Sequence, residues 1–104
     1  MSEEVLHRHG TTLVRRMRLA PGESTPWHSD PWHRVSIVVS GDRFAVELRD
    51  GSPTIHAKLT PGQVDWVEPS DRVHRAVNDG EQPLEVVTIY FLGHPDDLPQ
   101  VIHG

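Results

Sequence analysis

Turn signals interrupt this chain at intervals of about eight to twelve residues, which leaves room only for short strands. Between the turns, apolar and polar residues tend to alternate, so that Phe44, Val46 and Leu48 share one face of their segment. The segments expected to form strands are 11–19, 33–40, 43–49, 54–59, 63–67, 72–77 and 84–92. Short strands at this spacing predict an all-β sandwich or barrel.

Length and composition limit the partners of such a barrel. At 104 residues we expect one domain over 1–104, with the barrel at about 11–92 and a C-terminal tail over 93–104. The chain has no cysteine, which excludes disulfides and thiolate zinc sites. Its formal net charge of −5 argues against nucleic acid, and it has neither a signal-peptide pattern nor an apolar segment long enough for a membrane. We therefore expect a cytoplasmic protein whose partner is a small molecule, a metal or another protein.

The last predicted strand, 84–92, carries apolar side chains on both faces, whereas a strand with one face in water should alternate. Three explanations are open: the strand is central in its sheet, its outer face packs on a second subunit, or the tail covers it. We predict a homodimer built partly on this strand, because closed two-fold symmetry is the commonest arrangement of soluble homo-oligomers.

The segment 22–41 resembles the first sequence motif of the cupins, which reads G-x5-H-x-H-x3–4-E-x6-G. Gly22, His28 and Gly41 stand at matching positions. Asp30 stands where the motif has its second histidine, and Arg34 stands where it has the glutamate.

The segment 62–78 resembles the second cupin motif, which reads G-x5-P-x-G-x2-H-x3-N. Gly62, Pro69, His74 and Asn78 match, although one extra residue precedes Pro69 and Asp71 replaces the second glycine. The chain is therefore similar to small single-domain cupins. This resemblance implies a double-stranded β-helix, or jelly-roll barrel, with a pocket in its mouth.

The resemblance also implies a divalent metal ion, since cupins with intact motifs hold one with three histidines and one glutamate. Here His28, Asp30 and His74 could form a set of two histidines and one carboxylate, which suits non-haem iron. His33 could join them, because Pro31 can shift the face on which later residues lie. The sequence leaves both ligand sets open, as well as the choice among iron, manganese, zinc and nickel.

Arg34 favours a different interpretation, because a permanently charged guanidinium repels a cation. It could pair with Asp30 or Asp65 and leave a pocket without metal. A guanidinium in a barrel mouth could equally hold a substrate carboxylate through two parallel hydrogen bonds. Trp27, at the expected rim, and Arg75 are further candidates for contact with the ligand.

We thus predict a small cupin that binds a divalent metal through histidine and aspartate and acts on a small anionic organic molecule. The alternative is a cupin that binds or senses a small molecule without metal or catalysis. A third hypothesis is an assembly role in which strand 84–92 is the working surface. The residues assign no catalytic group and leave open whether the protein is an enzyme.

Overall fold

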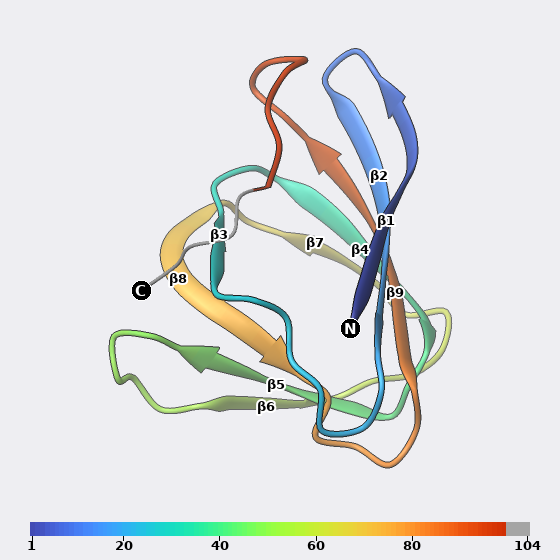
Figure 1. Ribbon diagram of the computed structural model, residues 1–104, viewed down its shortest axis with the longest axis vertical. Helices are drawn as coiled ribbons and strands as arrows, with labels where there is room; N and C mark the ends of the chain where they lie inside the picture. Colours follow the sequence, from blue (N-terminus) through green and yellow to red (C-terminus); the bar gives the residue numbers. More distant parts are fainter. Residues whose placement is uncertain (100–104) are drawn as a thin grey trace.

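The computed structural model describes residues 1–99, and in this range it consists of strands and connecting loops without helices (Figure 1). The all-β prediction is confirmed, and each of the seven expected segments contains a strand. The strands are β1 (Ser2–His9), β2 (Thr12–Leu19), β3 (His28–Asp30), β4 (Arg34–Ser40), β5 (Arg43–Leu48), β6 (Ile55–Lys58), β7 (Val64–Val67), β8 (Ser70–Val77) and β9 (Leu84–Phe91). The tail expected over 93–104 is described only as far as residue 99, and His103 lies outside the described residues.

The strands form two antiparallel sheets that face each other (Figure 1). One sheet has the order β1-β2-β9-β4-β7, and the other has the order β3-β8-β5-β6. Neighbouring strands are often distant in sequence, as where β2 pairs with β9 and β3 pairs with β8. No helix within residues 1–99 has the length and apolar character needed to cross a membrane.

Strand β1 was not expected, because most of its side chains are polar or charged and all but one of its residues are exposed. It pairs along its length with β2, across a turn at Gly10 where φ is +58°. Ion pairs reinforce the pairing, with Glu3 3.0 Å from Arg15 and Glu4 bonded to Arg16. The strand therefore depends on its partner, and its own sequence carries little β signal.

Strand β9 is central in its sheet, between β2 and β4, which accounts for part of its apolar character. Tyr90, on its inner face, packs with Leu13 and Leu92 in the buried core, against the partly buried Trp32. Its outer face carries Val87, Ile89 and Phe91, and Phe91 is 41% exposed.

Asn78, at the end of the second motif, is completely buried and holds three segments together. Its side-chain nitrogen donates to the carbonyls of Leu19 at 3.0 Å and Gln82 at 2.9 Å, and its side-chain oxygen accepts from the Gly80 amide at 3.0 Å. Its backbone carbonyl accepts from the Gly22 amide at 2.8 Å. The motif asparagine therefore has a structural role, in which it joins β2, β8 and the loop before β9.

Replacement of Asn78 by alanine should lower the free energy of unfolding by about 2–4 kcal/mol, because buried carbonyl and amide groups lose their partners. Urea denaturation of the full chain measures this change. Gln82→Ala, which removes an exposed amide side chain, should stay within about 0.5 kcal/mol of the parent protein. An unchanged midpoint for Asn78→Ala would contradict the structural role.

Candidate metal and ligand site

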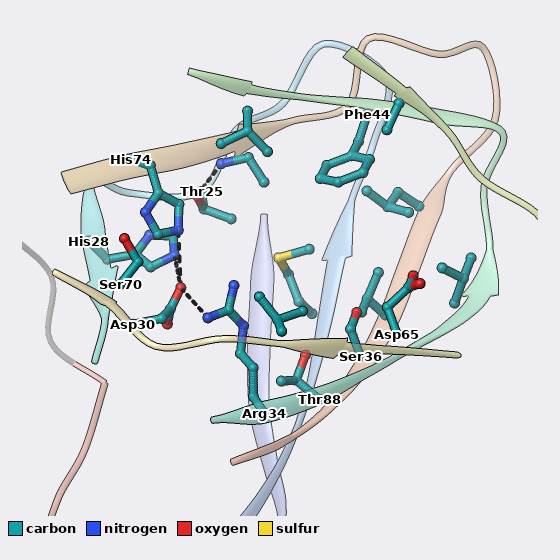
Figure 2. Close-up of a pocket in the computed structure, with 18 of the residues that line it drawn as sticks. Thr25, His28, Asp30, Arg34, Ser36, Phe44, Asp65, Ser70, His74 and Thr88 are labelled. Carbon is teal, nitrogen blue, oxygen red and sulfur yellow. Dashed lines mark hydrogen bonds and ion pairs between the residues drawn. The ribbon is translucent and has the colours of Figure 1, made fainter. Parts of the chain in front are cut away.

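A cavity of about 600 Å³ lies between the two sheets, and side chains from both sheets line it (Figure 2). His28, Asp30 and His74 lie at one end of this cavity, beside Arg34. Strand pairing sets their positions, since His28 on β3 is directly opposite His74 on β8. The register shifts between His28 and Asp30, so that Asp30 is opposite Ser70.

The two imidazoles approach one carboxylate oxygen. Asp30 Oδ2 lies 3.2 Å from His28 Nε2 and 3.1 Å from His74 Nε2. The ring centroids are 4.5 Å apart. The other nitrogen of each ring meets a backbone carbonyl, at 2.8 Å for His28 Nδ1 with Pro26 and 2.9 Å for His74 Nδ1 with Arg72. Because a carbonyl only accepts, both Nδ1 atoms carry hydrogen, and each Nε2 is the atom available as a ligand.

Asp30 is an anion at a buried position, with only 3% of the residue exposed. A third partner, Arg34 Nη1, lies 3.4 Å from the same Oδ2 atom. The second carboxylate oxygen, Oδ1, is buried and has no hydrogen-bond partner among the described residues. All the compensation for the negative charge therefore comes through one oxygen.

Burial raises the pKa of Asp30, but hydrogen bonds from His28 and His74 and the charge of Arg34 outweigh it and hold that pKa well below its usual range. Burial lowers the pKa of His28, but the hydrogen bond and charge of Asp30 more than offset burial, so the net pKa of His28 is raised. The site thus favours the ionised form of Asp30, and the Asp30 carboxylate in turn raises the pKa of His28.

The geometry of the three side chains fits a divalent ion. Their ligand atoms all lie within 4.8 Å of one another. An ion at about 2.1 Å from each atom would separate them by about 3.0–3.4 Å, which matches the two distances to Asp30 Oδ2. Two histidines and one carboxylate are also a ligand set that iron and related metals accept.

The structure does not bring His33 to this group. Its ring accepts a hydrogen bond from Trp66 Nε1 at 3.1 Å and lies 3.3 Å from a carboxylate oxygen of Glu68. Strand β4 begins at Arg34, which faces the cavity, and alternation turns the preceding residue outward. We therefore leave His33 out of the proposed ligand set.

The other residues expected near the ligand divide into two groups. Arg34 lines the cavity and pairs with Asp30, while Asp65 accepts a hydrogen bond from Gln63 Nε2 at 2.8 Å. Trp27 and Arg75 do not line it. The Arg75 guanidinium lies 4.5 Å from the centre of the Trp27 ring and 3.3 Å from Glu47.

Sequence reasoning missed Arg15, which lines the cavity beside Tyr90. Arg15 donates to the Tyr90 hydroxyl at 3.2 Å and pairs with Glu3, and all three side chains line the cavity. The segment 11–19 has a basic centre that includes Arg15, but the sequence pattern does not say which face of the strand is inward. The pairing of β2 with β9 supplies that information, because Leu13 and Tyr90 are opposite each other in the core.

Comparison with known proteins agrees with this architecture. The family model described as "Cupin domain" matches residues 15–90. No curated protein matches the chain significantly.

Solved structures match the fold over most of the chain. A cupin domain from Bordetella pertussis is 21% identical, with a TM-score of 0.75 over 86% of this chain and 90% of that one. A cupin-like protein from Thermotoga maritima is 22% identical, with a TM-score of 0.69 over 98% and 75%. Oxalate oxidase in complex with the substrate analogue glycolate is 18% identical, with a TM-score of 0.65 over 88% and 46%. At these identities the likeness shows the shared fold.

In the metal-free protein, the pKa of His28 should lie above its usual value of about 6.5 and should fall below it in Asp30→Asn, where burial acts without the counter-charge. The pH dependence of the ring proton signals in NMR spectra measures both values. Asp71→Asn, on the exposed part of β8, serves as a control and should leave the pKa of His28 unchanged.

The raised pKa of His28 also sets how this residue changes the stability of the fold with pH. His28 stabilises the fold below the unfolded pKa of about 6.5, and this contribution is lost as the pH rises through the folded pKa. If the pKa of His28 in Asp30→Asn equals the value in the parent protein, Asp30 is not the cause of the raised pKa.

Proposed function

The chain belongs to the cupin domain family, and we propose that it binds a divalent metal ion through His28, Asp30 and His74 and holds a small anionic organic molecule in the adjoining cavity. The observation that carries this proposal is the convergence of two Nε2 atoms and one carboxylate oxygen within 4.8 Å. The backbone carbonyls that hold both Nδ1 atoms support it, because they fix the ring orientations that ligation needs.

The donor set is compatible with iron and also with manganese, zinc or nickel. A bound ion would supply Lewis-acid polarisation of a ligand oxygen. The protein's own contributions are the orientation of the two imidazoles, the buried negative charge of Asp30, and the cavity that shields the ligand from bulk water.

Arg34 supports the proposal that the ligand is an anion. Its guanidinium faces the cavity beside Asp30, with 18% of the side chain exposed. A partly desolvated guanidinium binds carboxylates through two parallel hydrogen bonds. Oxalate oxidase, whose structure holds the substrate analogue glycolate, a small carboxylate, has a similar fold.

One observation favours the alternative of a binding or sensing protein without metal. Arg34 and the two histidines already compensate Asp30 when no ion is present. In that state the cavity still offers Arg34 to an anion, so binding would persist without catalysis. Metal analysis separates the two candidates.

Protein purified without metal-affinity resin and dialysed against Fe(II), Mn(II), Zn(II) or Ni(II) should take up about one equivalent of at least one of these ions. His74→Ala should bind that ion at least about tenfold more weakly, because it removes one of three ligands. Elemental analysis after equilibrium dialysis gives both results. His56→Ala, which removes an exposed histidine paired with Asp79, is the matched control. Negligible uptake of all four ions would favour the metal-free alternative.

We further propose that the partner on the outer face of the five-stranded sheet is a second copy of this chain. On β4, the residues that face outward are the apolar Val35, Ile37 and Val39, since Arg34, Ser36 and Val38 line the cavity. β7 adds the side chains of Val64 and Trp66, which are 61% and 58% exposed.

Trp66 stacks on Phe91 with ring centroids 5.4 Å apart, which makes the exposed apolar surface continuous from β7 to β9. Monomeric proteins rarely expose large continuous apolar patches. Burial of several such side chains would contribute about 1.5–3 kcal/mol each, which together can exceed the cost of about 4–15 kcal/mol for lost rigid-body freedom.

Sedimentation at micromolar concentration should therefore give a dimer, and Trp66→Glu should raise the dissociation constant at least about 100-fold, because a charge would be buried at the interface. Leu98→Glu places the same charge on an exposed leucine of the C-terminal segment, which is 54% exposed, and should leave the dimer intact. A monomer mass for the parent protein at micromolar concentration would contradict the proposed dimer.

A further inference from the structure

A row of polar side chains crosses the cavity wall of the five-stranded sheet. Cross-strand pairing places Arg15 on β2 opposite Thr88 on β9, Thr88 opposite Ser36 on β4, and Ser36 opposite Asp65 on β7. All four side chains line the cavity. In the next layer, on the side away from the histidines, β2, β9 and β4 present the apolar Met17, Val86 and Val38, and Gln63 lies beside Val38.

Three members of this row have hydrogen-bonding capacity that the protein does not use. Within residues 1–99, neither the Ser36 hydroxyl nor the Thr88 hydroxyl has a protein hydrogen-bond partner, and Asp65 contacts only Gln63. Figure 2 shows Ser36, Thr88 and Asp65 close together below Phe44, without an interaction to any other residue drawn. Ser36 and Thr88 are partly buried and Asp65 is exposed, so on the shared cavity wall their free hydrogen-bonding groups are open to a polar occupant.

We propose that Ser36, Thr88 and Asp65 form a subsite for the hydroxyl groups of the ligand, which is then a small polyhydroxylated carboxylic acid. This inference rests on the proposed function for the carboxylate end, where Arg34 lies, and deepens it by naming the ligand class.

The spacing of the row favours several hydroxyl groups over one cationic group. Neighbouring strands are about 4.8 Å apart, so the three side chains extend over about 10 Å. A single ammonium group is too compact to reach all three. A chain of hydroxyls can, and each hydroxyl both donates and accepts, which suits the two protein hydroxyls and the acceptor Asp65.

The position of Arg34 sets the distance between the two ends of the ligand. Arg34 lies two residues before Ser36 on β4, so its layer is about 7 Å from the polar row. The opposite wall of the cavity, from β5 and β6, is apolar and presents Phe44, Val46 and Ile55. Such a slot accepts a carbon chain with its carboxylate at Arg34, its hydroxyls toward the row and its C–H groups toward the apolar wall.

Five probes of matched chain length separate the two ends of the site: gluconate, hexanoate, sorbitol, 1-hexanol and ε-aminocaproate. Each is titrated into the metal-free full-length protein, and amide chemical shifts give the affinity and the location. We expect gluconate to bind at least about tenfold more tightly than hexanoate, because the added hydroxyls each gain hydrogen bonds. The perturbed amides should include those of Ser36 and Thr88.

Thr88→Val and Ser36→Ala remove one hydroxyl each at nearly constant shape. Each should reduce the preference for gluconate over hexanoate at least about threefold and leave hexanoate affinity unchanged, which also shows that the variant is folded. Thr54→Val, at an exposed position that does not line the cavity, is the matched control. Equal affinities for gluconate and hexanoate, or a preference that survives both substitutions, would overturn the subsite.

The remaining outcomes distinguish the subsite from the proposed function. If sorbitol binds as tightly as gluconate and depends on Thr88 and Ser36, the subsite is supported and carboxylate binding by Arg34 is contradicted. If ε-aminocaproate binds more tightly than gluconate, Asp65 selects a cation and the hydroxyl subsite is overturned. If none of the probes binds, both the subsite and the proposed anionic ligand are overturned.

Discussion

The buried carboxylate of Asp30 connects the two sheets, and the site depends on it. Asp30 belongs to β3, His74 is on β8 of the same sheet, and Arg34 is on β4 of the opposite sheet. The side chains of His28, His74 and Arg34 all approach Asp30 Oδ2, and together they offset the cost of burying the Asp30 charge. A divalent ion would compete for the same negative charge. The fold therefore places a structural ion-pair network and a candidate metal site on the same atoms, and loss of Asp30 would affect both.

The sequence could predict the elements whose signal is local. Alternation identified the inward face of β5, and the cupin motifs brought His28 and His74 to one site although 46 positions separate them in the chain. Strand β1 could not be found in this way, because its charged residues become a strand only by pairing with β2. The position of His33 depended on where β4 begins. One residue of difference there moves a side chain from the cavity to the outer face, and the sequence alone does not set that boundary.

The polar row of Ser36, Thr88 and Asp65 could not be predicted from the sequence either, because it depends on how distant strands pair. Each residue alone is an ordinary polar position in a strand with apolar neighbours. Only the register of β9 against β4, and of β4 against β7, puts the three side by side. Registers between strands that are distant in sequence follow from packing of the whole barrel, so the arrangement of the cavity wall is a property of the tertiary structure.

Two strands of the five-stranded sheet depart in part from the usual pattern, in which polar residues face water and apolar residues face the interior. On β4 and β9, Arg34, Ser36 and Thr88 face inward while Ile37, Val87 and Ile89 face outward. An inward polar face is stable when a cavity supplies water or a ligand, and an outward apolar face is stable when another surface covers it. The same two strands thus carry both the cavity wall and the proposed subunit contact. Because successive residues on them alternate between the two faces, a change at the contact lies next in sequence to a residue of the cavity, and the two proposed functions share one backbone register.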